Sequence, residues 1–242
     1  MIKISNLDKS FRQLKVLKGI TISFDAGKVV SIIGPNAAGK TTLIKCLLGM
    51  VIPDQGTILF DDMNIRHNDS YRKQIGYMPQ IGRYPDNMKV GQLFDMMKDI
   101  RNISPDDCID EELIEAFRLR TIFNKAMRTL SGGTRQKVSA ALAFLFCPRV
   151  LILDEPTAGL DPESAEMLKA KILSVRENRR LVLITSHVMS EVAELADSVL
   201  SLQEGRVIFY KPVTEILSET HEDRFSKAIV KLINQHQYVE NS

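Results

Sequence analysis

Short apolar runs alternate along the chain with segments in which apolar residues recur at helical spacing. Three of these runs have the length and composition of buried strands, namely Val29 to Ile33, Val150 to Leu153 and Leu181 to Thr185. A segment with helical spacing, Glu163 to Glu177, separates the last two. Strand, helix and strand in this order predict a parallel sheet that is covered by helices on both faces.

Four other apolar stretches lie among Gly and Asp turn residues and predict antiparallel strands beside this sheet. They are Ile2 to Leu7, Val16 to Phe24, Thr57 to Phe60 and Arg206 to Tyr210. The predicted fold class is therefore α/β, with a mostly parallel sheet and a flanking antiparallel β-subdomain.

Between Gln80 and Pro148 the strand signals nearly vanish and helical spacing takes over. The predicted helices of this interval are Val90 to Arg101, Asp110 to Leu119 and Gly132 to Phe146. We therefore expect a helical lobe over about 81–148, inserted into a single domain that spans residues 1–211. The tail, 212–242, also shows helical spacing and is expected to be a short helical extension.

Composition and charge narrow the range of partners. The chain has 242 residues, 44% of them hydrophobic, and a net charge of only +2. This balance disfavours nucleic acid and anionic membrane surfaces as partners. There is no secretory signal and no apolar run of about 18 residues, so any membrane function would come from a partner. The three cysteines are widely spaced, and we expect no disulfide framework, no zinc site and a reducing cytosol.

The segment Gly34 to Thr42, GPNAAGKTT, fits the pattern G-x-x-x-x-G-K-[ST] between a predicted strand and a predicted helix. Glycines in this position let backbone amides approach phosphates at the positive end of a helix. Lys40 would reach the β- and γ-phosphates, and the Thr41 hydroxyl would ligate Mg²⁺. A mere strand-to-helix turn with an exposed lysine is the weaker alternative. The predicted phosphate-binding residues are Gly34, Pro35, Asn36, Ala37, Ala38, Gly39, Lys40, Thr41 and Thr42.

Two further motifs carry candidate chemistry. Asp154 and Glu155 end a buried apolar run, and strand alternation directs their side chains to different places, so they can take different roles. Ser131 precedes two glycines and a predicted helix, which leaves backbone amides bare at a capped helix start. A solvated carboxylate pair and a plain capped turn are the alternative interpretations of these motifs.

Together with His187 after an apolar run, these motifs resemble the ATP-binding-cassette (ABC) ATPases, and the resemblance covers nearly the whole chain. It implies a P-loop NTPase core and one ABC nucleotide-binding domain over residues 1–211. Members of this family usually carry Gly where this chain has Ala37. If this position needs a positive φ, alanine would cost about 1 kcal/mol.

The resemblance also implies a role for each candidate residue. Asp154 would hold Mg²⁺, Glu155 would be the general base that polarises the attacking water, and Gln80 would sense Mg²⁺ and water. The predicted metal-binding residues are thus Thr41, Gln80 and Asp154, and the predicted catalytic residues are Lys40, Gln80, Glu155 and His187.

In the same family, the motif of Ser131 and the two glycines is a second phosphate grip, and it acts on ATP that the opposite subunit holds. Ser131, Gly132 and Gly133 would bind that γ-phosphate, and Asp161 would reach across the dimer. His187 would contact the γ-phosphate, and Phe11 would stack on adenine. A lone His, Gln or Phe is more often packing or surface, so the joint order of the motifs carries these assignments.

The implied protein is the cytosolic ATPase subunit of an ABC transporter, held peripherally on the inner face of the cell membrane. Two copies, or one copy and a paralogue, would close head-to-tail around two ATP·Mg²⁺. The helical lobe near Gln80 and Ile81 to Val90 would grip a separate membrane permease. No large regulatory domain follows Tyr210, which favours an exporter-type (ABC-2) system.

Within the family, the segments GPNAAGKTTLIKCLLGM and LSGGTRQKVSAALAFL are similar to the ATPase that serves copper-site maturation of nitrous oxide reductase. Exporters of drugs, lipids or sodium are alternatives. A soluble ABC ATPase acting on nucleic acid or the ribosome fits less well, because the interval from Gln80 to Leu130 is too short for a coiled-coil arm and no basic patch is evident.

Overall fold

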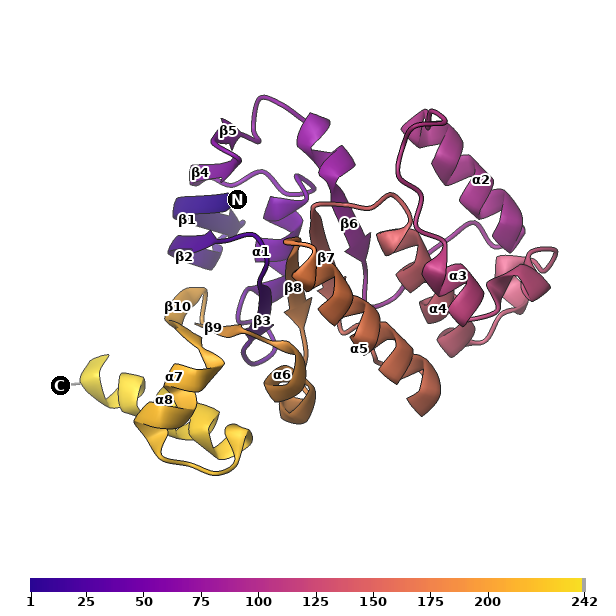
Figure 1. Ribbon diagram of the computed structural model, residues 1–242. Coiled ribbons are helices and arrows are strands. Elements are labelled where there is room, and N and C mark those ends of the chain that lie inside the picture. The colour runs from indigo at the N-terminus through magenta and orange to yellow at the C-terminus, as the bar shows by residue number, and fades with distance from the viewer. Residues whose placement is uncertain (241–242) are drawn as a thin grey trace. The chain divides into compact units, whose positions relative to one another are not determined.

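The computed structural model describes residues 1–240, which form two compact units. Unit 1 combines residues 1–71 with the chain from residue 181 onward, and unit 2 is residues 72–180. Figure 1 shows the elements of both units in chain order. Of the predicted helical tail, residues 241–242 lie outside the described residues.

Parallel strands form the centre of the main sheet of unit 1. β3 (Val29–Ile33) lies between β8 (Leu181–Thr185) and β9 (Ser198–Gln203), and β10 (Arg206–Pro212) pairs with β9 in the antiparallel sense. Every residue of β3 and β8 is buried, which is why their sequences are continuous apolar runs. The two strands run in register and therefore end at the same edge of the sheet.

The second sheet of unit 1 is antiparallel and has the strand order β2-β1-β4-β5. Its strands are β1 (Ile2–Phe11), β2 (Leu14–Phe24), β4 (Gln55–Phe60) and β5 (Met63–Asn64). Ile2, Ile4 and Leu7 of β1 are buried while the residues between them are largely exposed, so one face of this sheet packs on the core. A short helix, η1 (Ser70–Gln74), follows.

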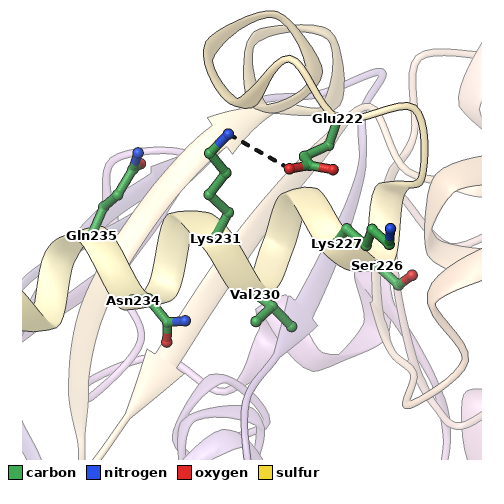
Figure 2. A pocket seen from close by; sticks show the side chains of 7 residues that line it. All are labelled: Glu222, Ser226, Lys227, Val230, Lys231, Asn234 and Gln235. Atoms are coloured by element: carbon green, nitrogen blue, oxygen red, sulfur yellow. Dashed lines mark ion pairs between the residues drawn. The ribbon is translucent and has the colours of Figure 1, made fainter.

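Four helices complete unit 1. They are α1 (Lys40–Leu47), α6 (Met189–Leu195), α7 (Val213–Thr220) and α8 (Phe225–Glu240). Helices α7 and α8 pack against each other, and α8 also contacts α6, so the tail is helical and attached to the core by apolar side chains (Figure 1). On the opposite face of α8, Lys231 pairs with Glu222 at 3.5 Å beside a shallow surface pocket (Figure 2).

Unit 2 contains two parallel strands and most of the predicted helices. β6 (Ile75–Met78) pairs with β7 (Val150–Asp154), and Met78 lies opposite Leu153, so both strands end at one edge. The helices are α2 (Val90–Arg101), α3 (Glu112–Ala116), α4 (Gly132–Phe144) and α5 (Pro162–Glu177), with short η2 (Leu119–Ile122) and η3 (Met127–Thr129). No helix among the described residues of the protein is both long and apolar enough to pass through a membrane.

Helix α3 is shorter than the predicted helix, Asp110 to Leu119. Asp110 stays outside it, because its carboxylate accepts a hydrogen bond from the amide of Glu112 at 3.2 Å and pairs with Lys171 of α5 at 2.7 Å. Lys171 is almost fully buried, so this pair fixes the start of α3 against α5. At the other end, Arg118 has a φ of 53°, and this left-handed residue separates α3 from η2.

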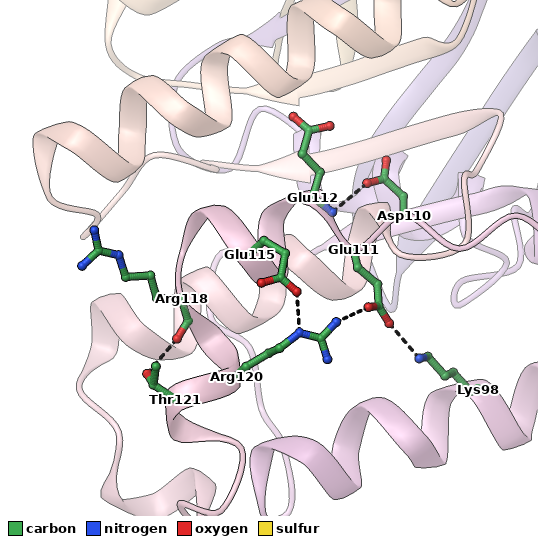
Figure 3. Close-up of polar contacts among 8 residues, drawn as sticks. All are labelled: Lys98, Asp110, Glu111, Glu112, Glu115, Arg118, Arg120 and Thr121. Carbon is green, nitrogen blue, oxygen red and sulfur yellow. Dashed lines mark hydrogen bonds and ion pairs between the residues drawn. The ribbon is translucent and has the colours of Figure 1, made fainter.

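A group of charged side chains joins α2, α3 and η2 (Figure 3). Glu111 pairs with Lys98 of α2 at 3.0 Å and also with Arg120 of η2, which in turn pairs with Glu115 of α3. The hydrogen bond from Lys98 is the largest cause that lowers the pKa of Glu111. The short helices of this region are therefore connected by side chains as well as by the chain itself.

The sequence-based strand and helix predictions are largely confirmed. All seven predicted strands are present, although several extend further than the apolar runs that indicated them. The pattern missed the two-residue strand β5. It also missed β9 and α6, because both lie in a stretch where polar residues interrupt the apolar ones. The α/β class, with parallel strands beside an antiparallel sheet, is confirmed.

No disulfide framework was expected from the spacing of the cysteines, but the structure contains one disulfide. Cys108 and Cys147 are bonded, with Cα atoms 5.9 Å apart and a sequence separation of 39. The amide of Asp110 donates to the carbonyl oxygen of Leu145 at 2.7 Å, and this bond brings the segment between α2 and α3 beside the end of α4. Cys108 and Cys147 are far apart in sequence but close in the fold, so their spacing did not indicate the bond. The third cysteine, Cys46, is buried, which raises its thiol pKa to about 11.

Opening this disulfide should lower the free energy of unfolding by about 2–4 kcal/mol, because the unfolded chain regains the freedom that the cross-link removes. Urea unfolding of the wild type with and without dithiothreitol measures the difference. The control is the double variant Cys108→Ser/Cys147→Ser, whose unfolding should not respond to dithiothreitol. Equal stability of the oxidised and reduced wild type would contradict the expectation.

Candidate functional site

The predicted site residues fall into two groups, one in each unit. In unit 1, the loop Gly34 to Gly39 connects β3 to α1 and leaves no room for side chains at its two glycines. A Cβ at Gly34 would lie 2.1 Å from the carbonyl oxygen of Leu202, and Gly39 has a φ of 105°. These glycines are therefore required by the packing of unit 1 itself.

The loop has the features of an anion-binding site. The ammonium group of Lys40 lies across it and donates to the carbonyl oxygens of Gly34 at 2.6 Å and Pro35 at 3.0 Å. Within the part of the chain that the structure describes, the amides of Ala37 and Gly39 donate to no protein acceptor. Bare amides, a lysine and a helix N-terminus together fit the phosphates of a nucleotide.

The other predicted phosphate-binding residues of this loop occupy its rim and the start of α1. Pro35 and Asn36 are exposed, whereas Ala38 is buried. Thr41 is exposed and Thr42 is half-buried, and both lie in the first turn of α1. The hydroxyl of Thr41 is therefore accessible to a metal ion or to solvent.

Ala37 has a φ of 65°, in the left-handed region where an L-residue with a Cβ is disfavoured. The sequence predicted a cost for Ala37 only if this position needs a positive φ, and the structure shows that it has one. The loop keeps its path despite this local cost, because Gly34, Gly39 and Lys40 fix its two ends.

His187 and Phe11 are the remaining predicted site residues of unit 1. His187 follows β8, which ends at the same sheet edge as β3, so the segments containing His187 and Gly34 leave the sheet on the same side. Phe11 ends β1 with about half of its surface exposed, and the ammonium group of Lys9 lies 5.4 Å from the centre of its ring. Its ring is thus accessible to a flat ligand.

Unit 2 brings the predicted base and the predicted sensor together. Gln80 follows β6 and Glu155 follows β7, and the amide group of Gln80 donates to the Glu155 carboxylate at 2.9 Å. Glu155 has a φ of 49°, a left-handed turn that directs the chain away from the strand. Asp154 remains the last residue of β7, near Tyr77, whose phenol pKa is raised by burial and then by the Asp154 charge.

Ser131 caps α4 in the predicted way. Its hydroxyl oxygen accepts a hydrogen bond from the amide of Thr134 at 3.2 Å. The two glycines that follow differ. A Cβ at Gly132 would meet open space, whereas a Cβ at Gly133 would lie 2.6 Å from the carbonyl oxygen of Gly159. Gly133 is therefore explained by packing inside unit 2, and Gly132 leaves the exposed helix end accessible.

The carboxylate of Asp161 is bound within its own chain. It caps α5 by accepting from the amide of Ser164 at 3.0 Å, and it pairs with Lys137 of α4 at 2.8 Å. These contacts, the one from Lys137 first, hold the pKa of Asp161 well below its usual range. A role of Asp161 toward a second copy stays a prediction.

Lys137 was missed by the sequence analysis. It directly follows the segment Leu130 to Gln136, and in a sequence it resembles any solvated lysine on a helix. Its contact with Asp161 follows from the close approach of α4 and the segment before α5, which no local pattern reveals. Arg135 was missed for the same reason, although its guanidinium donates to the carbonyl oxygens of Met127 and Arg128 at 3.1 and 3.2 Å.

Comparisons with known proteins agree with this arrangement. The family described as ABC transporter matches residues 17–158. The lantibiotic transport ATP-binding protein SrtF of Streptococcus pyogenes is 32% identical over 95% of this chain and 98% of its own length. The lipopolysaccharide export system ATP-binding protein LptB of Escherichia coli is also 32% identical, over 90% of this chain and 93% of its own length.

A solved structure shares the fold. It is an ATP-binding cassette in a dimeric, post-hydrolysis state with bound ADP and Pi, and it superimposes with a TM-score of 0.78 at 21% identity. The match covers 88% of this chain and 98% of that one.

Replacing Ala37 by Gly should raise the free energy of unfolding by up to about 1 kcal/mol, because glycine adopts a positive φ without the steric cost of a Cβ. Urea unfolding measures the effect. Ala38→Gly is the matched control, since Ala38 is buried and is not among the residues with positive φ, and it should lower stability by about 0.5–1 kcal/mol. A loss of stability in Ala37→Gly equal to that in the control would show that the Ala37 methyl stabilises the loop.

Proposed function

The chain belongs to the ABC transporter family and is an ATP-binding, ATP-hydrolysing subunit, and from this premise we propose that it drives an exporter as a head-to-tail dimer. The observation that carries the proposal is the second phosphate grip at Ser131. This exposed, capped helix end has open space at Gly132 that nothing in the chain itself requires. A glycine without a packing role at a positive helix end is expected where a phosphate must approach closely.

In the proposed reaction, Glu155 polarises the water that attacks the γ-phosphate. The hydrogen bond from Gln80 orients the carboxylate, so the base is held in one direction before substrate arrives. Lys40 and the bare amides of its loop stabilise the charge on the phosphates. His187 contacts the γ-phosphate, and Phe11 offers its exposed ring to adenine.

Each unit also offers side chains whose chemistry suits Mg²⁺ as a cofactor. Thr41, Gln80 and Asp154 offer a hydroxyl, an amide oxygen and a carboxylate, which are the hard oxygen ligands that Mg²⁺ prefers. When bound, the ion would neutralise charge on the phosphates. The chain's own contribution is to present Thr41 in the first turn of α1 and Asp154 at the end of β7.

The dimer proposal is supported by the dimeric state of the solved cassette, which shares this fold. In the proposed dimer of this chain, one copy would bind the nucleotide through Ser131, Gly132 and Gly133. The phosphates of that nucleotide would lie in the Lys40 loop of the other copy. The partner is a second copy of this chain or a paralogous ATPase subunit.

A membrane permease is the other proposed partner, and a pocket in unit 2 is its proposed docking site. This pocket of 380 Å³ is lined by Ile81, Gly82, Arg83, Tyr84, Asp86, Met127 and Arg135. Ile81 lines this pocket with 71% of its surface exposed, so its apolar side chain is available to a partner. Through this partner the subunit would be held at the inner face of the cell membrane.

The cargo remains a narrower proposal. LptB belongs to an export system, which supports export, but SrtF is equally identical and serves lantibiotic transport. The proposed role in copper-site maturation of nitrous oxide reductase therefore rests on the likeness of two segments alone. Export of drugs, lipids or sodium is the alternative. Co-purification with a polytopic membrane protein would separate all of these from a soluble ATPase that acts on nucleic acid or the ribosome.

Glu155→Gln should slow hydrolysis by about a hundredfold or more while ATP still binds, because the amide keeps the shape but not the charge of the base. With ATP, size-exclusion chromatography should then show this variant at twice the monomer mass. Adding Ser131→Arg should abolish the shift, because a bulky cation enters the second phosphate grip. A monomeric, ATP-loaded Glu155→Gln protein, tested together with its permease, would contradict the dimer.

Ile81→Asp and Arg83→Glu should reduce the fraction of the protein that sediments with membranes containing the permease. Tyr84 is a poor choice for this test, because its hydroxyl bonds to the buried Ser139 at 3.0 Å. Ile100→Asp is the matched control, since Ile100 is similarly exposed on α2 and does not line the pocket. Equal membrane association of Ile81→Asp and Ile100→Asp would place the docking surface elsewhere.

A further inference from the structure

Lys137 lies between the two functional segments of unit 2. It is on α4, the helix that Ser131 caps, and its ammonium group is 2.8 Å from the Asp161 carboxylate at the start of α5. The same group lies 5.8 Å from the centre of the buried Phe117 ring. Only about a fifth of the Lys137 side chain is exposed, so its stem is held by packing while its charge is used by Asp161.

Asp161 closes the segment that begins at Glu155. Within this segment, the amide of Ala158 donates to the carbonyl oxygen of Glu155 at 3.1 Å, and that of Leu160 donates to Thr157 at 3.1 Å. These two hydrogen bonds close overlapping tight turns between Glu155 and Leu160. A short and internally bonded piece of chain therefore joins the Lys137–Asp161 pair to Glu155.

A second connection joins α4 to the other side of Glu155. Tyr84 donates to Ser139 of α4 at 3.0 Å, and Tyr84 follows Gln80 by four residues. Gln80 in turn donates to Glu155 at 2.9 Å. The contacts thus close a ring from Glu155 through Gln80 and Tyr84 to α4, and back through Lys137 and Asp161.

The backbone contact at Gly133 lies on the same path. Gly133 and the carbonyl oxygen of Gly159 approach so closely that a Cβ would not fit between them. The first turn of α4 thus touches the segment between Glu155 and Asp161 directly. Lys137, one turn further along α4, fixes the end of that segment and keeps the contact in register.

We propose that Lys137 is a positioning residue for ATP hydrolysis, which by its pairing with Asp161 holds the segment after Glu155 against the helix that begins at Ser131. This rests on the proposed role of Glu155 as the base. Lys137 contacts neither the substrate nor the water. Its charge sets where the base stands relative to the start of α4.

Removing this charge should lower kcat for ATP hydrolysis without weakening ATP binding. Lys137→Met keeps an apolar stem over Phe117, and we expect it to reduce kcat about tenfold, because small displacements of a reacting group are costly in rate. The KM for ATP should stay within about twofold of the wild type. Lys137→Arg keeps the charge and should restore most of the rate.

Two controls are available: substitution of the partner residue Asp161, and substitution of a lysine in a comparable ion pair. Asp161→Asn keeps an acceptor for the Ser164 amide but removes the charge, and the double variant Lys137→Met/Asp161→Asn should be no slower than either single one if the pair acts as a unit. Lys169→Met removes another lysine of unit 2, which pairs with Glu166 of the same helix, α5, at 2.6 Å. It should leave kcat unchanged.

Full kcat in Lys137→Met, or an equal loss in Lys169→Met, would overturn the proposal. A loss that Lys137→Arg fails to recover, or one that tracks a fall in the melting temperature, would do the same. Glu155→Gln is measured in the same series. If Glu155→Gln keeps full turnover, the assignment of the base fails and takes this proposal with it. If Glu155→Gln is inactive and Lys137→Met is not impaired, the proposal about Lys137 fails alone.

Discussion

The carboxylate of Asp161 binds two elements of unit 2 at once. One contact caps α5 through the amide of Ser164, and the other holds α4 through Lys137. A helix cap requires the acceptor to lie within reach of the first turn, and an ion pair requires the cation to come to it. Meeting both conditions fixes the direction from which α4 approaches. The close contact of Gly133 with Gly159, and hence the exposed start of α4, depends on that direction.

Parallel register places the chemistry within each unit. In unit 1, β3 and β8 end together, so the Lys40 loop and His187 leave the sheet at one edge. In unit 2, β6 and β7 end together, which is why Gln80 and Glu155 can bond although 75 residues separate them. At these edges the chain must turn sharply, and Ala37 and Glu155 both adopt left-handed conformations that are unfavourable for residues with a Cβ. Local strain of this kind is typical of functional sites, where the surrounding structure imposes it.

The sequence predicts those features that a local pattern of residues determines. β3 and β8 are buried on both faces, so their sequences alone identify them as strands of a parallel sheet. The start of α4 was predictable because Ser131 carries the chemistry of a cap. The start of α3 and the disulfide were not, because each depends on a contact between distant residues: Asp110 with Lys171, and Cys108 with Cys147. Local spacing carries no record of such approaches, and Lys137 was overlooked for the same physical reason.

Helix α4 connects the phosphate-binding end of unit 2 to the pocket proposed for the permease. Its first turn carries Ser131, and Arg135, four residues later, both lines the pocket and holds η3 through the carbonyl oxygens of Met127 and Arg128. Tyr84 lines the same pocket and bonds to Ser139 of this helix. A permease that shifts residues of the pocket would therefore move α4 as a rigid body, because helices transmit small displacements along their length. In the proposed complex, the same displacement would reach Glu155 by way of Lys137 and Asp161, and the permease would then have a physical route to the rate of hydrolysis.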